Sequence, residues 1–228
     1  MHHFTYLTTP LAALTASVLA LPLISHGSGG HFAVDDAALT DPGRCQIEAW
    51  YARSDRDNDE MTILPACNPS GNLEVTLGIS RVQEAQQRDS ITELALKTQL
   101  LPLARDRIEV AVSVAGFRSH DASKFIGGEA LVPVTVQLSE RLMSHINVGW
   151  GWQRGDDDAA LLGLAFDYAL HEQVSVIAEG YGTHRGESRY GAGFRFAPVD
   201  GLDIDFAVDA GRRDHRDNAV IAGMAIAF

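Results

Sequence analysis

Acidic side chains recur at alternate positions in several segments of this chain, and they outnumber the basic side chains that share the pattern. The acidic residues are Glu48, Glu74, Glu93, Glu109, Asp167, Glu179, Asp203, Asp205 and Asp209, and the basic ones are Lys97, Arg189 and Arg195. Acidic rings that line a water-filled pore favour cations, because a low-dielectric wall concentrates their field. In a narrow pore such side chains pair with one another and fill the space instead. The residues alone leave both interpretations open.

Three histidines in polar stretches are weak candidates for a metal site. His120, His184 and His215 each lie within three residues of an Asp or a Glu. Imidazole and carboxylate groups together can bind zinc or copper if the loops that carry them converge. Solvated loop histidines are the more frequent case, so we predict no metal site and no cofactor.

A serine and a histidine in the same region could belong to a hydrolase. Ser119, His120 and Asp121 supply a nucleophile, a base and an acid, and His184 with Ser188 supplies two of these types. Adjacent residues on one chain rarely converge into a triad, and no recognised catalytic motif surrounds either set. We therefore predict that the protein is not an enzyme.

The segments that must position these side chains show the period of two of a β-strand. Six runs alternate strictly and a seventh ends the chain at Phe228, namely 72–80, 108–115, 146–152, 162–168, 190–196, 202–208 and 223–228. Four less regular runs are 45–52, 91–101, 131–138 and 173–182. The sequence therefore contains eleven candidate strands.

The alternation indicates a barrel whose apolar face meets lipid. Eleven strands enclose an interior too wide for apolar side chains to fill, whereas a polar, glycine-rich face suits a watery lumen. Aromatic rings near the strand ends on the apolar face are typical of membrane interfaces; here they are Trp150, Trp152, Tyr168, Tyr190, Phe196 and Phe228. A soluble sandwich is the alternative. We predict an all-β fold, a single antiparallel transmembrane β-barrel of 10 to 12 strands.

The odd number of candidate strands needs a resolution, because single-chain bacterial barrels have even strand numbers. Either residues 31–37 supply a twelfth strand, or 45–52 belong to a segment that enters or covers the pore of a ten-stranded barrel. The Asp-rich stretch 53–71 is expected to be a long connection at the periplasmic rim. Longer polar loops, such as 81–90 and 118–128, are expected at the outer rim.

Charge and hydropathy exclude two classes of protein. The formal net charge is -12, and without a basic patch the chain is not expected to bind nucleic acid. No apolar run reaches the roughly 18 to 20 residues of a spanning helix. A shorter apolar block at 11–24, followed by small residues, is typical of an export signal. We predict a signal peptide over 1–27, with cleavage after Gly27 or as late as Gly30; a buried or interfacial helix is the alternative.

The two cysteines, Cys45 and Cys67, predict one disulfide if the chain is exported, because oxidising compartments favour a bond over free thiols. Two free buried thiols are the alternative. The expected organisation is a signal peptide over 1–27, an N-terminal segment over 28–71 that contains the disulfide and is part strand or pore-covering, and a barrel over 72–228.

Two parts of the chain resemble known outer-membrane proteins. The alternation that ends at Phe228 is similar to the terminal strand by which such proteins are recognised for insertion. The stretches Val34-Asp35-Asp36-Ala37, Asp41-Pro42-Gly43 and Gln46-Ile47-Glu48 resemble the opening of the bacterial family of transporters of the meta-pathway of phenol degradation.

This resemblance implies a barrel in the outer membrane of a Gram-negative bacterium. We expect a passive channel or uptake protein for small solutes, with a weak cation preference. Its expected partners are outer-membrane lipid, small solutes and the insertion machinery that recognises the C-terminal strand. The alternative function is a structural or interaction protein with a plugged lumen.

Overall fold

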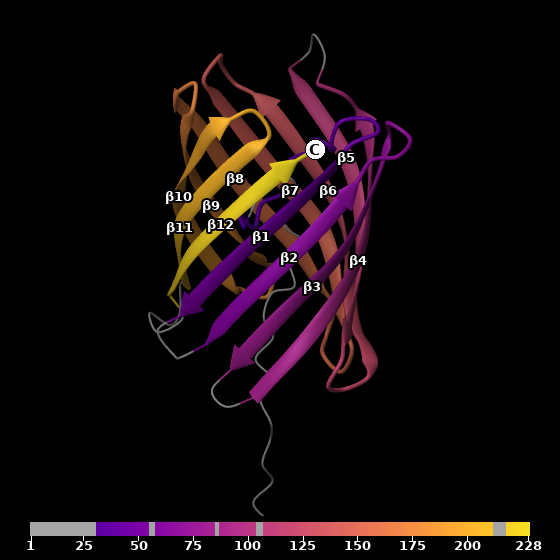
Figure 1. Ribbon diagram of the computed structural model, residues 1–228. Helices are drawn as coiled ribbons and strands as arrows, with labels where there is room; N and C mark the ends of the chain where they lie inside the picture. The colour runs from indigo at the N-terminus through magenta and orange to yellow at the C-terminus, as the bar shows by residue number, and fades with distance from the viewer. Residues whose placement is uncertain (1–30, 55–57, 85–86, 104–106, 212–217) are drawn as a thin grey trace, which may run out of the picture.

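All eleven alternating runs form strands, and a twelfth strand completes a closed antiparallel β-barrel (Figure 1). The computed structural model describes residues 31–54, 58–84, 87–103, 107–211 and 218–228. The strands are β1 (Cys45–Ser54), β2 (Asp59–Cys67), β3 (Leu73–Glu84), β4 (Gln87–Leu101), β5 (Ile108–Ser119), β6 (Lys124–Gln137), β7 (Leu142–Gln153), β8 (Ala159–His171), β9 (Val174–Thr183), β10 (Ser188–Val199), β11 (Leu202–Gly211) and β12 (Ala219–Ala227). The predicted fold class is confirmed.

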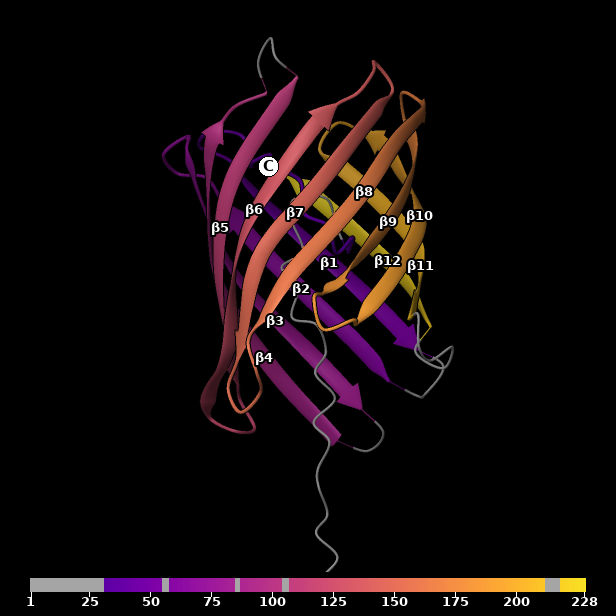
Figure 2. The ribbon, with the colours of Figure 1, turned by 180° about the vertical axis from the view of Figure 1, so that it is seen from behind.

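The barrel closes between its first and last strands. β1 pairs with β12 in antiparallel register from Gln46 opposite Ala227 to Ser54 opposite Ala219, and the other neighbours are consecutive in sequence (Figures 1 and 2). Every strand is therefore paired on both sides, which leaves no sheet edge with unsatisfied backbone groups. Within the described ranges, no helix is long and apolar enough to cross a membrane.

The two faces of the sheet have opposite polarity. Leu77 and Phe206 are 59% and 46% exposed, whereas Glu74 and Glu109 are 4% and 7% exposed. Apolar side chains thus point away from the barrel and acidic ones point into it, which is the orientation of a lipid-facing barrel. The six aromatic residues predicted near the strand ends are all exposed on the outer face: Trp150, Trp152, Tyr168, Tyr190, Phe196 and Phe228.

The twelfth strand is β2, in the stretch that the sequence predicted to be a long connection. β2 pairs with β1 from Cys45 opposite Cys67 to Arg53 opposite Asp59, and it pairs with β3 on its other side. The prediction for 53–71 was wrong because β2 lacks a clear alternation. Its inward face carries Leu64 and Ala66 as well as Thr62, so both faces contain apolar residues.

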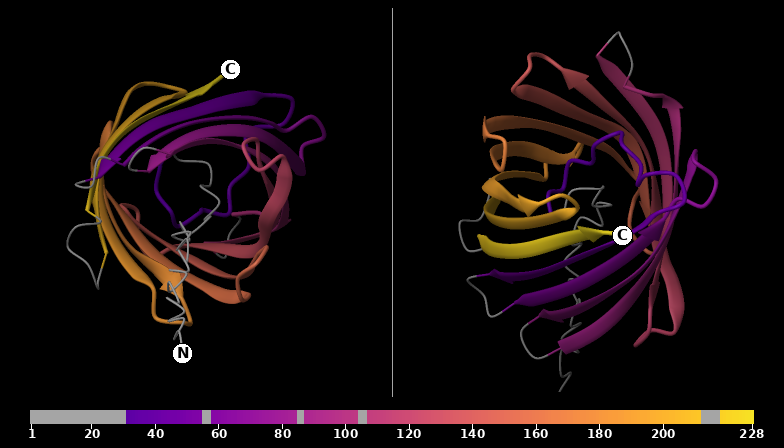
Figure 3. Two further views of the ribbon diagram at one scale, coloured as in Figure 1. Left: turned by 90° about the horizontal axis from the view of Figure 1, so that it is seen from below. Right: turned by 45° about the horizontal axis from the view of Figure 1, so that its top comes forward.

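Residues 31–44, which we call the lumen segment, contribute no strand; 31–40 run inside the barrel, and 41–44 form an exposed turn that leads to β1 (Figure 3). The prediction that 31–37 form a strand was therefore wrong, and so was the alternative in which 45–52 enter the pore. The segment joins β1 at the rim where β1 begins and β12 ends, which we call the Cys45 rim. The predicted signal peptide lies outside the described residues.

At the rim opposite the Cys45 rim, which we call the far rim, two expected long loops are mostly strand. β3 extends to Glu84 and β4 begins at Gln87, while β5 and β6 are separated only by residues 120–123. Polar residues at the strand ends lack the apolar alternation but still pair across the antiparallel ladder, for example Arg81 with Ser90. The barrel wall therefore extends beyond its apolar band at this rim.

Candidate functional site

The lumen segment crosses the interior of the barrel and reaches strands on several sides of it. Its most buried residues are His31, Phe32, Ala33, Val34, Asp35, Ala37 and Thr40. At one end, Thr40 binds a side chain of β3. At the other end, His31 approaches β12, because a Cβ added to Gly223 would lie 3.2 Å from its Nδ1. The candidate site is therefore the lumen wall together with the segment it surrounds (Figure 3).

A carboxylate of β9 binds two consecutive amides of the segment. Glu179 accepts hydrogen bonds from the backbone N–H groups of Ala33 at 3.2 Å and of Val34 at 2.9 Å. On β6, the hydroxyl oxygen of Thr135 accepts a hydrogen bond from the N–H of Ala37 at 2.9 Å. A buried N–H group without a partner is costly, so these wall side chains replace the ladder that a strand would supply.

Asn147 on β7 forms a pair of hydrogen bonds with the main chain of Asp35. Its Oδ1 accepts from the Asp35 N–H at 2.7 Å, and its Nδ2 donates to the Asp35 carbonyl oxygen, also at 2.7 Å. The side chain of one wall residue therefore satisfies both polar groups of one residue of the segment.

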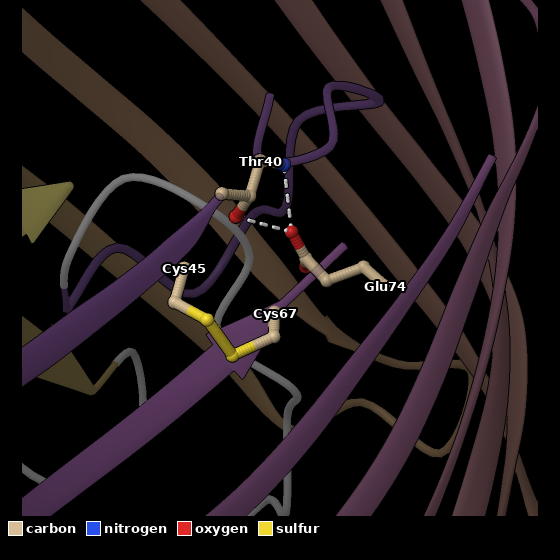
Figure 4. The surroundings of a disulfide bond; sticks show 4 residues. All are labelled: Thr40, Cys45, Cys67 and Glu74. Carbon is tan, nitrogen blue, oxygen red and sulfur yellow. Dashed lines mark hydrogen bonds between the residues drawn. A yellow bond between two sulfur atoms is a disulfide. The ribbon is translucent and has the colours of Figure 1, made fainter. Parts of the chain in front are cut away.

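Near the Cys45 rim, Glu74 holds the segment through Thr40 (Figure 4). The Oε2 atom of Glu74 accepts from the Thr40 N–H at 2.7 Å and from its hydroxyl at 2.6 Å. The carbonyl oxygen of Thr40 accepts from Nδ2 of Asn68 at 2.7 Å. The base of the segment is thus fixed to β3 and to the connection that follows β2.

The disulfide lies beside this attachment point. Cys45 and Cys67 are bonded at the ends of β1 and β2 (Figure 4). Next to it, the N–H of Gly43 donates to the carbonyl oxygen of Asn68 at 2.7 Å, and the N–H of Asn68 donates to that of Arg44 at 3.0 Å. The predicted bond is therefore present, and it joins the two strands where the lumen segment leaves the wall.

Side chains of the segment also have specific partners. The Nζ atom of Lys97 on β4 lies 2.8 Å from Oδ1 of Asp35 and 3.7 Å from Oδ1 of Asp36. Because Lys97 and Asp35 are both buried, their attraction is weakly screened.

The aromatic ring of the segment packs at the opposite wall. Phe32 clusters with Ile177 on β9 and Ala207 on β11. The guanidinium carbon of Arg195 lies 5.8 Å from the ring centroid, within the range of a cation–π contact. The wall therefore recognises an aromatic and an acidic side chain as well as the main chain.

Two arginines of the wall form ion pairs with aspartates of the adjacent strand. Arg195 on β10 binds Asp205 on β11 through two nitrogens, at 2.9 and 3.1 Å, and its Nε lies 3.9 Å from Asp203. Arg189 binds Asp209 farther toward the far rim, where its Nε and Nη2 both contact Oδ1. The three basic side chains singled out in the sequence are thus all engaged by carboxylates.

The acidic residues predicted from the sequence lie on strand faces that point into the lumen, and they are buried to different extents. Glu48, Glu74, Glu109, Glu179, Asp205 and Asp209 are buried, whereas Glu93, Asp167 and Asp203 are partly exposed. The segment itself is contacted by Glu74, Lys97, Glu179 and Arg195. Sequence reasoning missed Thr135 and Asn147, whose inward positions in alternating runs were the available signal.

The candidate histidines are not brought together. His120 forms a hydrogen bond of 2.7 Å between its Nε2 and the hydroxyl of Thr92. His184 accepts a bond from the N–H of Ala160 at its Nδ1 and stacks on Trp150. His215 lies outside the described residues. In the part of the chain that the structure describes, no three His, Cys, Asp or Glu side chains group to hold a metal ion.

The hydrolase candidates also have separate partners. The hydroxyl of Ser119 donates to Asp89 at 2.6 Å, while His120 contacts Thr92 instead. The geometry therefore does not assemble the three residues 119–121 into a triad, which requires a serine-to-histidine hydrogen bond.

Comparison with known proteins identifies a family and a fold. A family model described as "Uncharacterised conserved protein UCP029691" matches residues 17–228. No curated protein is similar enough to the chain to count as a match. The resemblance of the opening residues to the phenol meta-pathway transporters stays a prediction.

Solved structures of similar fold include outer-membrane porins. A KdgM porin superposes with a TM-score of 0.67 at 9% identity, over 80% of this chain and 99% of its own. A structure titled "KdgM porin in complex with disordered oligogalacturonate" gives 0.65 at 9%, with the same coverage. A NanC porin gives 0.62 at 10%, over 80% of this chain and 98% of that one. At these identities the likeness shows the fold alone.

Proposed function

The chain belongs to the family described as uncharacterised conserved protein UCP029691, and we propose that it is an outer-membrane channel for small solutes, narrowed by its own lumen segment. The observation that carries this proposal is the polarity of the barrel. Apolar side chains such as Leu77 and Val148 are exposed outside, while charged side chains such as Glu109 lie inside. A barrel that places charge in its interior and hydrocarbon on its surface suits an aqueous path through lipid.

The solute path is proposed to prefer cations weakly. The acids singled out in the sequence number nine and the bases three, Lys97, Arg189 and Arg195, and the structure adds Glu129, which is buried on the inner face of β6. Each basic group is engaged by carboxylates, so the surplus charge inside the barrel is negative. The porins of similar fold support a small-solute channel, and one of them was solved with oligogalacturonate.

The proposed location is the outer membrane of a Gram-negative bacterium, with the Cys45 rim on the periplasmic side. β1 begins and β12 ends at this rim, which suits an even-stranded barrel with periplasmic termini. We propose that residues 1–27 are a signal peptide and that the strand ending at Phe228 engages the insertion machinery. Mass spectrometry of protein purified from outer membranes should find a chain that begins at Ser28, or at His31 if cleavage follows Gly30.

A second candidate function is a structural or interaction role, in which the lumen of the barrel is closed. It is favoured by the lumen segment, which Glu74, Thr135, Asn147 and Glu179 hold across the interior. No catalytic role is proposed, because Ser119 and His120 have separate partners.

Planar-bilayer recording of the full chain separates the two functions. The channel proposal predicts discrete current steps with a larger permeability for potassium than for chloride. A correctly folded barrel that passes no current, both in the native chain and in a variant whose lumen segment is loosened by Asp35→Ala, would establish the closed barrel instead.

A further inference from the structure

We infer that the lumen wall is a recognition site for an extended oligopeptide, and that residues 31–40 occupy it as a built-in ligand. This inference rests on the proposed channel, since it names the class of solute that the channel would admit. It starts from the fact that the wall binds the segment mainly through the segment's main chain.

The contacts match the repeating groups of a peptide. The main chain of Ala33, Val34, Asp35, Ala37 and Thr40 is bound by side chains that come from separate strands. The two oxygens of one carboxylate, that of Glu179, accept from successive N–H groups. A ligand that lacked N–H groups at this spacing would leave these acceptors without their donors, which is costly in a buried site.

The wall also discriminates against other linear solutes. Asn147 both accepts from an N–H and donates to a carbonyl of the same residue, so a polyamine, which has no acceptor, could satisfy only half of it. An anionic oligosaccharide would bring its carboxylates toward Glu74 and Glu179, which would repel them. A peptide main chain supplies both polarities without negative charge.

Two side-chain positions add specificity. Phe32 packs on Ile177 and Ala207 beneath Arg195, and three residues later Asp35 binds Lys97. Between them, Val34 lies so close to Gly163 that a Cβ added to this glycine would come within 2.9 Å of its Cγ2. The inferred ligand therefore has an aromatic residue followed, three positions later, by an acidic one.

The lumen segment is covalently joined to the barrel, so an external peptide would have to compete with it for the wall. The segment continues directly into β1 through Arg44, so its effective concentration at the wall is high. Weakening the segment without altering the wall should open the site. The double variant Phe32→Ala, Asp35→Ala does this in the full chain, and Asp35→Asn is a milder second variant in case the double variant folds poorly.

The probe is a synthetic peptide with the sequence of residues 31–40, labelled with a fluorophore. We expect it to bind the detergent-solubilised double variant at least tenfold more tightly than a peptide of the same composition in scrambled order, as measured by fluorescence anisotropy. Replacing Asn147 by Leu in the double variant should weaken the binding of the peptide by about tenfold, because it removes two hydrogen bonds to the main chain of one residue. Oligogalacturonate should not displace the peptide.

Bilayer recording separates this inference from the proposed channel. Block of the double variant's current by the peptide, but not by its scrambled form, supports both. A conducting variant that binds neither peptide overturns the peptide site and leaves the channel standing, and equal binding of the two peptides overturns the two side-chain positions. A variant that never conducts but still prefers the native peptide sequence overturns the channel and keeps the site. If oligogalacturonate displaces the peptide, the inferred ligand class is wrong.

Discussion

The Nζ atom of Lys97 lies 2.8 Å from Oδ1 of Asp35, and this buried ion pair joins the lumen segment to β4 across 62 residues of sequence. Removing two charges from water is expensive, and only their close approach and further hydrogen bonds compensate for it. The main chain of Asp35 is held separately, by Asn147. The pair is therefore sensitive to the loss of either partner.

The first prediction concerns this pair. Replacing Lys97 by Met leaves Asp35 buried beside Asp36 without its cation, which should weaken the docking of the lumen segment by about 3 kcal/mol. Hydrogen exchange followed by mass spectrometry should then show about 100-fold faster exchange of the amides in residues 33–37. The double variant Lys97→Met, Asp35→Asn should recover part of the protection. Unchanged exchange in Lys97→Met would mean that the pair does not hold the segment.

The second prediction tests the orientation of the wall toward lipid. Val148 is exposed on the outer face in the middle of β7, and Val199 is exposed at the rim, where β10 ends. An arginine costs about 2–4 kcal/mol at the bilayer midplane and about 0–1 kcal/mol near the interface. Val148→Arg should therefore lower the free energy of unfolding in lipid vesicles far more than Val199→Arg does, in a guanidinium titration. If both variants lost the same small amount of unfolding free energy, the apolar face would not lie in a bilayer.

The third prediction concerns ion selectivity. Glu109→Gln with Asp167→Asn removes two negative charges from the lumen face. A carboxylate about 10 Å from a passing ion contributes about 0.4 kcal/mol in water, and salt screens it further. The double variant should therefore lower the potassium-to-chloride permeability ratio by about two- to threefold, measured from the reversal potential in a salt gradient.

A matched control for this variant is Glu140→Gln with Asp200→Asn, which removes two negative charges from exposed turns at the Cys45 rim. It should leave the reversal potential nearly unchanged. If the two variants shift the potential equally, the lumen carboxylates do not set the selectivity.

The fourth prediction concerns the disulfide, which closes a loop between residues 22 apart in sequence. Constraining a loop of this length in the unfolded chain is worth about 3 kcal/mol. Cys45→Ala with Cys67→Ala should lower the free energy of unfolding by about that amount, while the barrel still closes because β1 and β2 keep their ladder. A thiol assay on native protein unfolded without reductant should find no reactive thiol; two would contradict the bond.

The strands and their orientation followed from local pattern. Alternation is encoded between residues two positions apart, so runs such as 72–80 and 202–208 could be assigned to β3 and β11 with their acidic faces inward. β2 escaped this reasoning because Leu64 and Ala66 face the lumen, which removes the contrast between its faces. Its identity as the twelfth strand depends on its pairing with both β1 and β3.

The position of the lumen segment could not follow from local pattern. Its sequence has no strand period, and its hydrogen bonds reach partners from 34 residues away, at Glu74, to 146 residues away, at Glu179. Side chains so distant in sequence meet only when the barrel has closed around the segment. The residues by themselves therefore determined a lipid-facing barrel with an acidic interior, because that depends on near neighbours along each strand. Only the tertiary structure decided what fills this interior, because that depends on groups which closure brings together.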